Sequence, residues 1–110
     1  MANARSKMQD DPAVDPMDQD AYWRDNFETR EYYELNQPYS NYAPAYRYGW
    51  ESFGRYRGKS WDQVEGDLGR GWERAKGQSQ LAWEKAKHAV RDAWHRVERA
   101  LPGDFDKDGR

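Results

Sequence analysis

Tryptophan recurs every eleven residues through most of the chain, at positions 50, 61, 72, 83 and 94. Eleven residues of α-helix turn through about 1100°, or three turns plus roughly 20°, so each tryptophan returns to nearly the same helical face. A second apolar residue follows three positions later in each repeat, as Phe53, Val64, Ala75, Ala86 and Val97. This pattern predicts amphipathic helices that bury their tryptophan-bearing face.

Local signals divide the pattern into three helices, which we place at about 44–57, 61–76 and 80–101. Pro44 suits the first turn of the first helix, because the backbone N–H that proline lacks has no helical partner there. Gly58 then ends that helix, since glycine is the usual residue just beyond a helix C-terminus.

The later helix boundaries carry their own signals. Ser60 and Gln63 have the spacing of a capping box, in which each side chain bonds the backbone N–H of the other residue. Gly77 is suited to end the second helix, because glycine adopts the left-handed conformation without strain. Ser79 suits the N-cap of the third helix.

The repeat keeps its phase across both turns, and this leaves two architectures open. In the first, three helices form a bundle and direct their tryptophans at a shared core. In the second, one nearly continuous helix runs from about 60 to 101 and tolerates Gly77 and Ser79. The second form would need a partner to cover so long an apolar stripe.

The rest of the chain separates into a leader, an arm and a tail around the three-helix domain at 43–101. Residues 1–20 carry five Asp against two basic residues and hold no aromatic residue, which is typical of a disordered acidic leader. Residues 21–42 contain five tyrosines without a sustained period, so we expect a partly extended aromatic arm with one short helix near 20–28. Residues 102–110 form an acidic tail.

The composition decides what the core is made of. The 110 residues include no Ile, four Leu and four Val, but six Trp and eight Tyr. So short a chain holds one small core, and aromatic rings must supply most of it. We therefore predict an all-α fold of marginal stability: a small three-helix bundle with a Trp/Tyr-rich core, a disordered acidic N-terminus and an extended aromatic arm.

Several functional classes lack their usual sequence signals. The absence of Cys excludes disulfides and thiolate chemistry. No signal-peptide pattern or membrane-length apolar run occurs, so we expect a cytoplasmic protein. No nucleophile elbow, phosphate-binding glycine loop or carboxylate pair in an apolar setting is found. We expect no enzymatic activity, no cofactor and no small-molecule substrate.

Two resemblances rest on short motifs. The sequences PAYRYGWE (44–51), WDQVEGDL (61–68) and AWHRVE (93–98) resemble a group of small uncharacterised bacterial proteins that are linked to general stress responses. That resemblance implies a role in stress but brings no known chemistry and no site residues. The eleven-residue period with Ala, Glu and Lys between the tryptophans of 72–98 is similar to the repeats of late-embryogenesis-abundant proteins, although those repeats lack tryptophan.

Two groups of side chains are candidates for binding a metal. His88 and Asp92 are close enough on a helix to share a divalent ion, whereas His88 and His95 lie about 10 Å apart along the axis. The alternative is that these residues form a solvated helix face. Near the C-terminus, Asp104, Asp106, Asp108 and Gly109 match the opening of an EF-hand calcium loop, but the later ligands are missing, so an acidic tail is the alternative.

Basic and aromatic residues alternate around the first turn between helices. The basic residues are Arg47, Arg55, Arg57, Lys59, Arg70 and Arg74, and the tyrosines among them are Tyr46, Tyr48 and Tyr56. Such a surface suits single-stranded nucleic acid, because phosphates pair with the cations and bases stack on the rings. The alternative is that arginine and tyrosine pack on each other as cation–π pairs. A Trp stripe flanked by Lys and Arg would also suit an anionic membrane surface.

The function predicted from the sequence is non-catalytic. We expect a small bacterial, stress-associated protein that acts through self-association or by binding another macromolecule, either as a homo-oligomer or with an unidentified protein partner. The alternative is a nucleic-acid or anionic-membrane binding module that uses the Arg/Tyr/Trp surface. The residues expected to hold the fold together are Trp50, Trp61, Trp72, Trp83 and Trp94.

Overall fold

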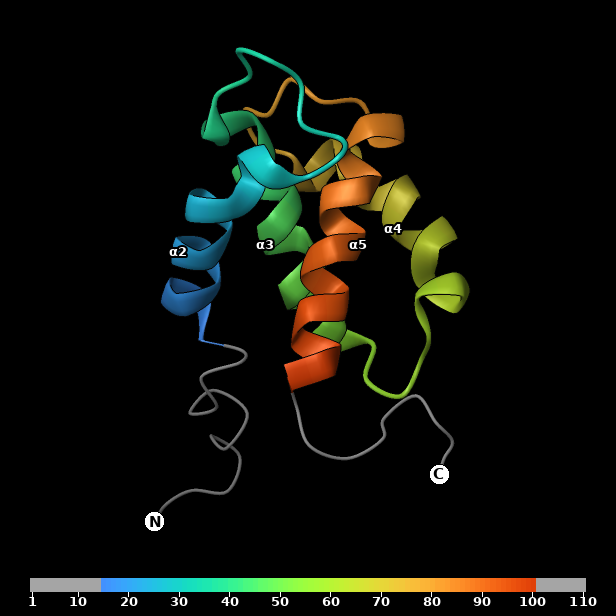
Figure 1. Ribbon diagram of the computed structural model, residues 1–110. Helices are drawn as coiled ribbons and strands as arrows, with labels where there is room; N and C mark the ends of the chain where they lie inside the picture. The colour runs from blue at the N-terminus through green and yellow to red at the C-terminus, as the bar shows by residue number, and fades with distance from the viewer. Residues whose placement is uncertain (1–14, 101–110) are drawn as a thin grey trace.

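The computed structural model describes residues 15–100, which form four α-helices and one short 3-10 helix. These elements are α2 (Pro16–Asn26), η3 (Phe27–Thr29), α3 (Tyr39–Arg55), α4 (Trp61–Ala75) and α5 (Trp83–Ala100). In Figure 1, α2 and α4 run upward while α3 and α5 run downward, with α3 and α5 side by side in the centre. The predicted all-α class with a Trp/Tyr-rich core is confirmed.

Helix α2 extends into the segment predicted to be a disordered leader. Asp15 caps it by accepting a 2.9 Å hydrogen bond from the backbone N–H of Met17, and Pro16 occupies its first turn. The predicted short helix at 20–28 therefore starts too late and ends slightly beyond the α-helical part. The apolar pattern did not predict this helix, because one of the two buried residues of α2 is polar: they are Gln19 and Trp23.

Helix α3 begins at Tyr39, five residues before the predicted start. Pro44 lies inside the helix instead of in its first turn. A proline there leaves the carbonyl of residue 40 without its helical partner. Ser40 is exposed, so water can satisfy that carbonyl, and the proline is tolerated. Much of the predicted extended arm is thus helical, and 30–38 is the connector between η3 and α3.

The boundaries of α4 follow the sequence signals closely. The Ser60 hydroxyl accepts a bond from the Gln63 N–H at 3.3 Å, and the Gln63 side chain accepts one from the Ser60 N–H at 2.9 Å, which confirms the capping box. Gly58 and Gly77 have positive φ angles of 89° and 57° beyond the ends of α3 and α4. The break at Gly77 makes the continuous-helix alternative wrong.

Ser79 is not the N-cap of the last helix, and α5 begins at Trp83. The buried Ser79 hydroxyl instead donates a 2.6 Å hydrogen bond to the Asn41 carbonyl and accepts one from the Leu81 N–H at 3.1 Å. The Asn41 side chain also accepts from the Gln80 N–H at 3.1 Å. These bonds fasten the extended 78–82 segment to the start of α3, so the polar groups are satisfied without a helix.

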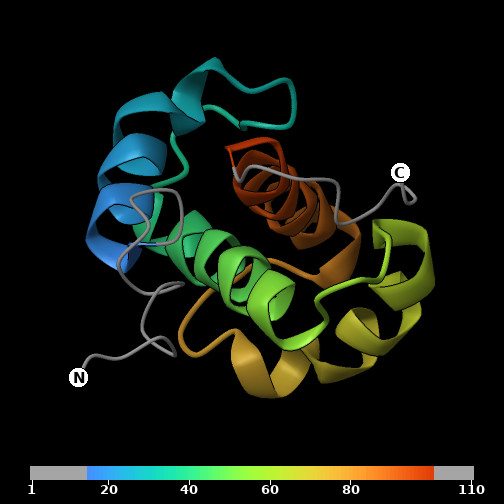
Figure 2. The ribbon, with the colours of Figure 1, turned by 90° about the horizontal axis from the view of Figure 1, so that it is seen from below.

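The tightest packing in the fold joins α3 to α5, which run side by side in Figure 2. A Cβ atom at Gly49 would lie 2.3 Å from the Val90 carbonyl oxygen and 2.8 Å from the Ala93 Cβ. Ala45, Ala86 and Ala89 are also fully buried, so small residues let the two backbones approach. The large rings pack on both sides of this contact.

The five tryptophans of the repeat differ in burial. Trp72 and Trp94 are 0 % exposed, Trp61 is 6 % exposed and Trp50 is 7 % exposed, whereas Trp83 is half-buried. The core also includes aromatic rings from outside the repeat, namely Trp23, Phe27, Tyr42, Tyr46, Tyr48 and Phe53. The apolar stripe is therefore largely buried within a single chain.

Candidate functional site

The predicted His–carboxylate group lies on α5, but its members are engaged with other residues. Asp92 accepts hydrogen bonds from the Arg30 Nε at 2.8 Å and from the Tyr32 hydroxyl at 2.6 Å. His95 lies 3.0 Å from a Glu98 oxygen, and His88 stacks on the Tyr32 ring at 5.9 Å. Within residues 15–100, no group of three or more His, Cys, Asp or Glu side chains is arranged to hold a metal ion.

A chain of hydrogen bonds connects Asp92 to the core. Because Tyr32 gives its single proton to Asp92, Tyr46 is the donor in the 2.8 Å contact between the two phenols. Burial raises the pKa of Tyr32, and the nearby Tyr46 hydroxyl and Asp92 carboxylate raise it further. Burial likewise raises the pKa of Tyr46. This network ties the connector to α3 and α5 and holds both phenols neutral.

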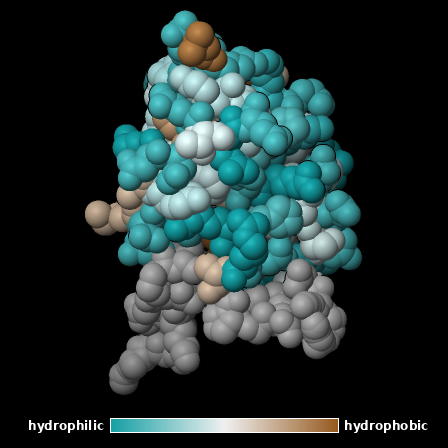
Figure 3. Space-filling view, in the orientation of Figure 1, coloured by the Kyte–Doolittle hydropathy of each residue, from teal (hydrophilic) through white to brown (hydrophobic). Residues whose placement is uncertain are grey.

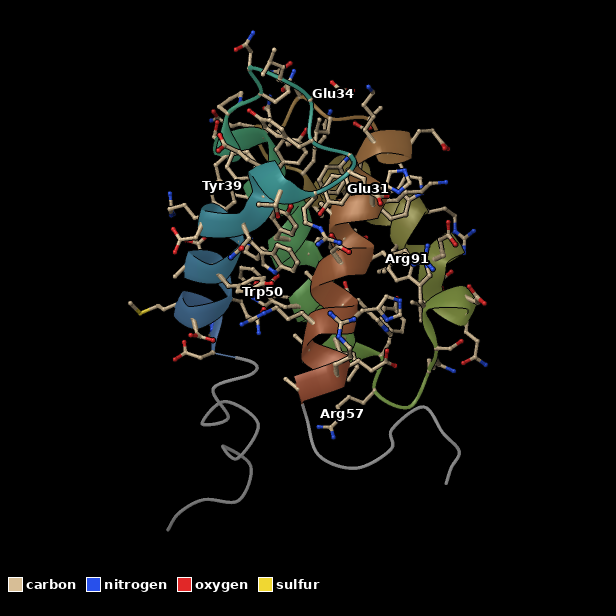
Figure 4. The ribbon with its side chains drawn as sticks, in the orientation of Figure 1. Glu31, Glu34, Tyr39, Trp50, Arg57 and Arg91 are labelled. Atoms are coloured by element: carbon tan, nitrogen blue, oxygen red, sulfur yellow. The ribbon has the colours of Figure 1, made fainter. Side chains whose placement is uncertain are left out.

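A cavity of about 300 Å³ opens beside this network. It is lined by Arg30, Glu31, Tyr32, His88, Arg91, Asp92 and His95. Figure 4 shows Arg91 and Glu31 on the same front face. Arg91 also borders two neighbouring cavities of about 190 Å³ each, which add acidic residues from α4 and α5. The lining carries both charge signs, so its composition selects no one ligand class.

The five arginines predicted to contact nucleic acid or lipid are all exposed, but they differ in their surroundings. Arg47 lies on the α2 side of α3, and Figure 4 shows Arg57 at the lower end of the molecule. Arg70 is paired with Asp67 one turn earlier on α4. Arg55 of α3 and Arg74 of α4 both act on the Tyr48 hydroxyl. Burial raises the pKa of the Tyr48 hydroxyl, while these two guanidiniums both act to lower it.

The tyrosines that alternate with those arginines are turned inward. Tyr46 is 0 % exposed and Tyr48 is 9 % exposed, and the Tyr48 hydroxyl donates a 2.8 Å bond to the Leu68 carbonyl. Gly71 makes room for that hydroxyl, because a Cβ there would lie 2.6 Å from it. The structure therefore brings the cations to the surface without the stacking rings.

Acidic and basic side chains are segregated along the chain. Residues 15–38 carry seven acidic side chains and two basic ones, whereas residues 39–100 carry twelve basic and eight acidic ones. Asp25, Glu28 and Glu31 are exposed and form no ion pair within residues 15–100. We call these three residues the acidic face.

Basic side chains on α3, on α4 and in the turn between them carry the complementary charge. Arg55, Lys59 and Arg74 are exposed and have no ion-pair partner in the part of the chain that the structure describes. We call these three residues the basic face. In Figure 2 the connector after α2 lies on the opposite side of the molecule from the second half of α4, the part of that helix to which Arg74 belongs. The acidic and basic faces therefore come from different elements of the fold.

Apolar side chains are scattered over the surface. Met17 and Leu35 are each 81 % exposed, and Tyr22 is covered by the Arg96 guanidinium 3.8 Å from its ring centre. Figure 3 shows a mostly hydrophilic face with isolated apolar spots. None of the helices between residues 15 and 100 has the length and apolar character needed to cross a bilayer.

Comparisons with known proteins give no family for this chain. No protein-family model matches it, and neither a curated protein nor a solved structure shows significant similarity to it. The predicted calcium ligands Asp104, Asp106 and Asp108 lie outside the described residues. The two charged faces and the cavities of residues 15–100 are therefore the candidate sites.

Proposed function

We propose that the protein is a non-catalytic binding protein that associates with further copies of itself through its acidic and basic faces. The observation that supports this is the segregation of charge that forms no ion pair within residues 15–100: Asp25, Glu28 and Glu31 on α2, η3 and the connector, and Arg55, Lys59 and Arg74 on α3, α4 and the turn between them. Opposite charges on two surfaces steer association and fix which surfaces meet.

Burial of the aromatic stripe favours a contact through charged side chains. With Trp72 and Trp94 at 0 % exposure, association through the stripe would require the helices to separate. The aromatic rings are already used to stabilise the fold, which leaves the polar surface for binding. Exposed charges interact over a Debye length of about 10 Å at 0.1 M salt, so the proposed association weakens as salt is added.

The contact would be heterologous, because the two faces are made of different residues on different elements. The acidic face of one copy then meets the basic face of the next, and the assembly closes into a ring or extends. Nucleic acid is the less favoured occupant of the basic face. Tyr46 and Tyr48 offer no stacking surface, and the whole chain has a net charge of −2.

A cytoplasmic, stress-related role in a bacterium is part of the same proposal. It is supported by the motifs at 44–51, 61–68 and 93–98, which resemble those of small stress-associated bacterial proteins. A protein that associates through exposed charges would respond to ionic strength, which changes under osmotic stress. Salt-dependent assembly is therefore a physical property through which such a role could operate.

Charge reversal tests the association directly. The full chain is compared with Arg55→Glu/Arg74→Glu and with Glu28→Lys/Glu31→Lys by sedimentation velocity, at two protein concentrations and two salt concentrations. We expect the unmodified protein to associate at low salt and each double variant alone to be a monomer. An equimolar mixture of the two variants should associate again, because each reversed face now has an oppositely charged counterpart.

Arg99→Glu is the matched control, since Arg99 is an exposed cation on α5 and belongs to neither face. This variant should associate like the unmodified protein. Association that persists in both double variants, or a mixture that stays monomeric, argues against pairing of the two faces. A protein that is monomeric at every salt level but binds an added oligonucleotide would assign the basic face to nucleic acid.

A further inference from the structure

A cavity of about 350 Å³ lies between α2 and α3, away from both charged faces. It is lined by Pro16, Met17 and Asp20 of α2 and by Ala43, Arg47 and Trp50 of α3. The three α3 residues are spaced by four and three positions, so they share one helical face. The volume is within the range of small-molecule sites, roughly 300–1,000 Å³. Most of the lining is apolar, and Met17 is 81 % exposed at its edge.

The indole N–H of Trp50 is a buried donor without an acceptor. Trp50 is 7 % exposed, and its Nε1 has no hydrogen-bond partner. The N–H groups of Trp23 and Trp94 also lack acceptors, but those rings are sealed at 3 % and 0 % exposure. Trp50 differs because it borders an open cavity, on the side of α3 that faces α2 (Figure 4). The N–H itself is sealed from solvent, so the indole ring borders the cavity and its N–H signal can report an occupant without bonding to it.

Arg47 adds a positive charge to the same cavity. It is exposed and has no hydrogen bond or ion pair with residues 15–100. Arg47 and Trp50 are one turn apart and both line the cavity, so an anionic group that binds the Arg47 guanidinium lies near the indole ring. A planar guanidinium binds carboxylates with two parallel hydrogen bonds, which makes a carboxylate a good match for Arg47.

Asp20 limits the charge that the cavity accepts. One of its carboxylate oxygens accepts from the Tyr39 hydroxyl at 2.9 Å, and the other accepts from the Arg24 guanidinium at 2.6 Å. These partners compensate its charge for a monoanion on the opposite wall. A second negative charge on the ligand would be repelled by Asp20, so the lining disfavours phosphate and dicarboxylates.

We infer that the cavity between α2 and α3 binds a small monocarboxylate with an apolar body. The carboxylate accepts hydrogen bonds from Arg47, and the apolar body covers Met17, Pro16 and Ala43 beside the Trp50 ring. This inference is independent of the association between charged faces, because it uses none of the residues of either face. Binding requires no covalent step.

The test is a ¹H–¹⁵N nuclear magnetic resonance titration of the full chain with octanoate. The signal of the Trp50 indole is assigned by its loss in Trp50→Phe, which keeps an aromatic ring and removes the donor. We expect octanoate to shift this signal in a saturable way and to leave the Trp94 indole signal in place. Acetate, octanol and inorganic phosphate should each bind at least about tenfold more weakly, because each lacks the apolar body or the single negative charge.

Two exposed arginines provide a matched comparison. Arg47→Gln should weaken octanoate binding by about tenfold or more, and Arg99→Gln should leave it unchanged. Arg47 is exposed, so this variant is expected to fold even if Trp50→Phe does not. An unmoved Trp50 signal, equal binding of octanol, or full affinity in Arg47→Gln would each overturn the inference.

Discussion

Gly49 lies so close to Val90 that a Cβ atom at position 49 would be 2.3 Å from the Val90 carbonyl oxygen. This contact sets the distance between α3 and α5, the two helices that share the largest interface of the fold. The neighbouring atoms are backbone and the Ala93 Cβ, so the space cannot be made by turning a flexible side chain. The glycine is required by packing, although its sequence position is an ordinary helix interior.

We expect Gly49→Ala to lower the free energy of unfolding by about 2–3 kcal/mol, because the added methyl group forces the two backbones apart. Gly54→Ala in the same helix is the control. A Cβ there meets no atom within 4 Å, so the higher helix propensity of alanine should raise stability by up to about 1 kcal/mol. Urea unfolding followed by circular dichroism measures both. Equal effects of the two changes would contradict the proposed role of Gly49.

The tryptophans of the repeat should differ in their contribution to stability. Trp94 is 0 % exposed and makes edge contacts with Phe53 at 5.2 Å and with Trp61 at 5.9 Å. We expect Trp94→Ala to cost about 3–5 kcal/mol, which would unfold a small domain of marginal stability. Trp83 is half-buried, and Trp83→Ala should cost roughly 1–2 kcal/mol. The far-ultraviolet circular dichroism of the two variants distinguishes these outcomes, and a folded Trp94→Ala protein would refute the ranking.

The Ser79 hydroxyl should stabilise the segment before α5 through its buried hydrogen bonds. Ser79→Ala removes the bond to the Asn41 carbonyl and leaves the buried Leu81 N–H without its acceptor, at a cost of about 1–3 kcal/mol. Ser40→Ala removes an exposed hydroxyl from the neighbouring turn of α3 and serves as the control. Hydrogen exchange of the Leu81 amide reports the effect locally. Exchange that is equally fast in both variants would show that the hydroxyl is dispensable.

Much of the fold can be predicted from the sequence, because the correct predictions concern features that depend on residues close together in the chain. The Ser60 capping box and the glycines at 58 and 77 define their helix boundaries through backbone chemistry that needs no tertiary context. The tryptophan repeat indicated the buried faces of α4 and α5 for the same reason, since helical period and burial coincide there.

The errors have tertiary causes. The position of Ser79 predicts a helix cap. Its hydroxyl instead bonds to the carbonyl of Asn41, which lies 38 residues earlier in the chain. Pro44 predicts a helix start, but it lies inside α3. The proline is tolerated there because Ser40, whose carbonyl loses its helical partner, is exposed to water. The sequence predicted that tyrosines would lie on the basic surface, because the order of residues does not show that Tyr48 turns inward toward Gly71.

Buried phenols should make the fold sensitive to alkali. Burial is the largest cause that raises the pKa of Tyr32, Tyr39 and Tyr46 in the folded protein, whereas a phenol in the unfolded chain titrates near 10. Below about pH 10 both states keep these protons, and the stability from the neutral phenols is fully present. Above that pH the unfolded state binds fewer protons than the native state, so the free energy of unfolding falls as pH rises.

Each of these phenols contributes up to about 1.4 kcal/mol per pH unit to that fall. We expect cooperative unfolding above about pH 10, with tyrosinate absorbance appearing together with the loss of helical circular dichroism. Tyr32→Phe should reduce the dependence of the free energy of unfolding on pH by the contribution of one phenol. It also removes the bond to Asp92 and so lowers stability at neutral pH. Tyrosinate absorbance that develops fully while the helices persist would show that these rings ionise in the folded protein, and the proposed sealing of the core would then be wrong.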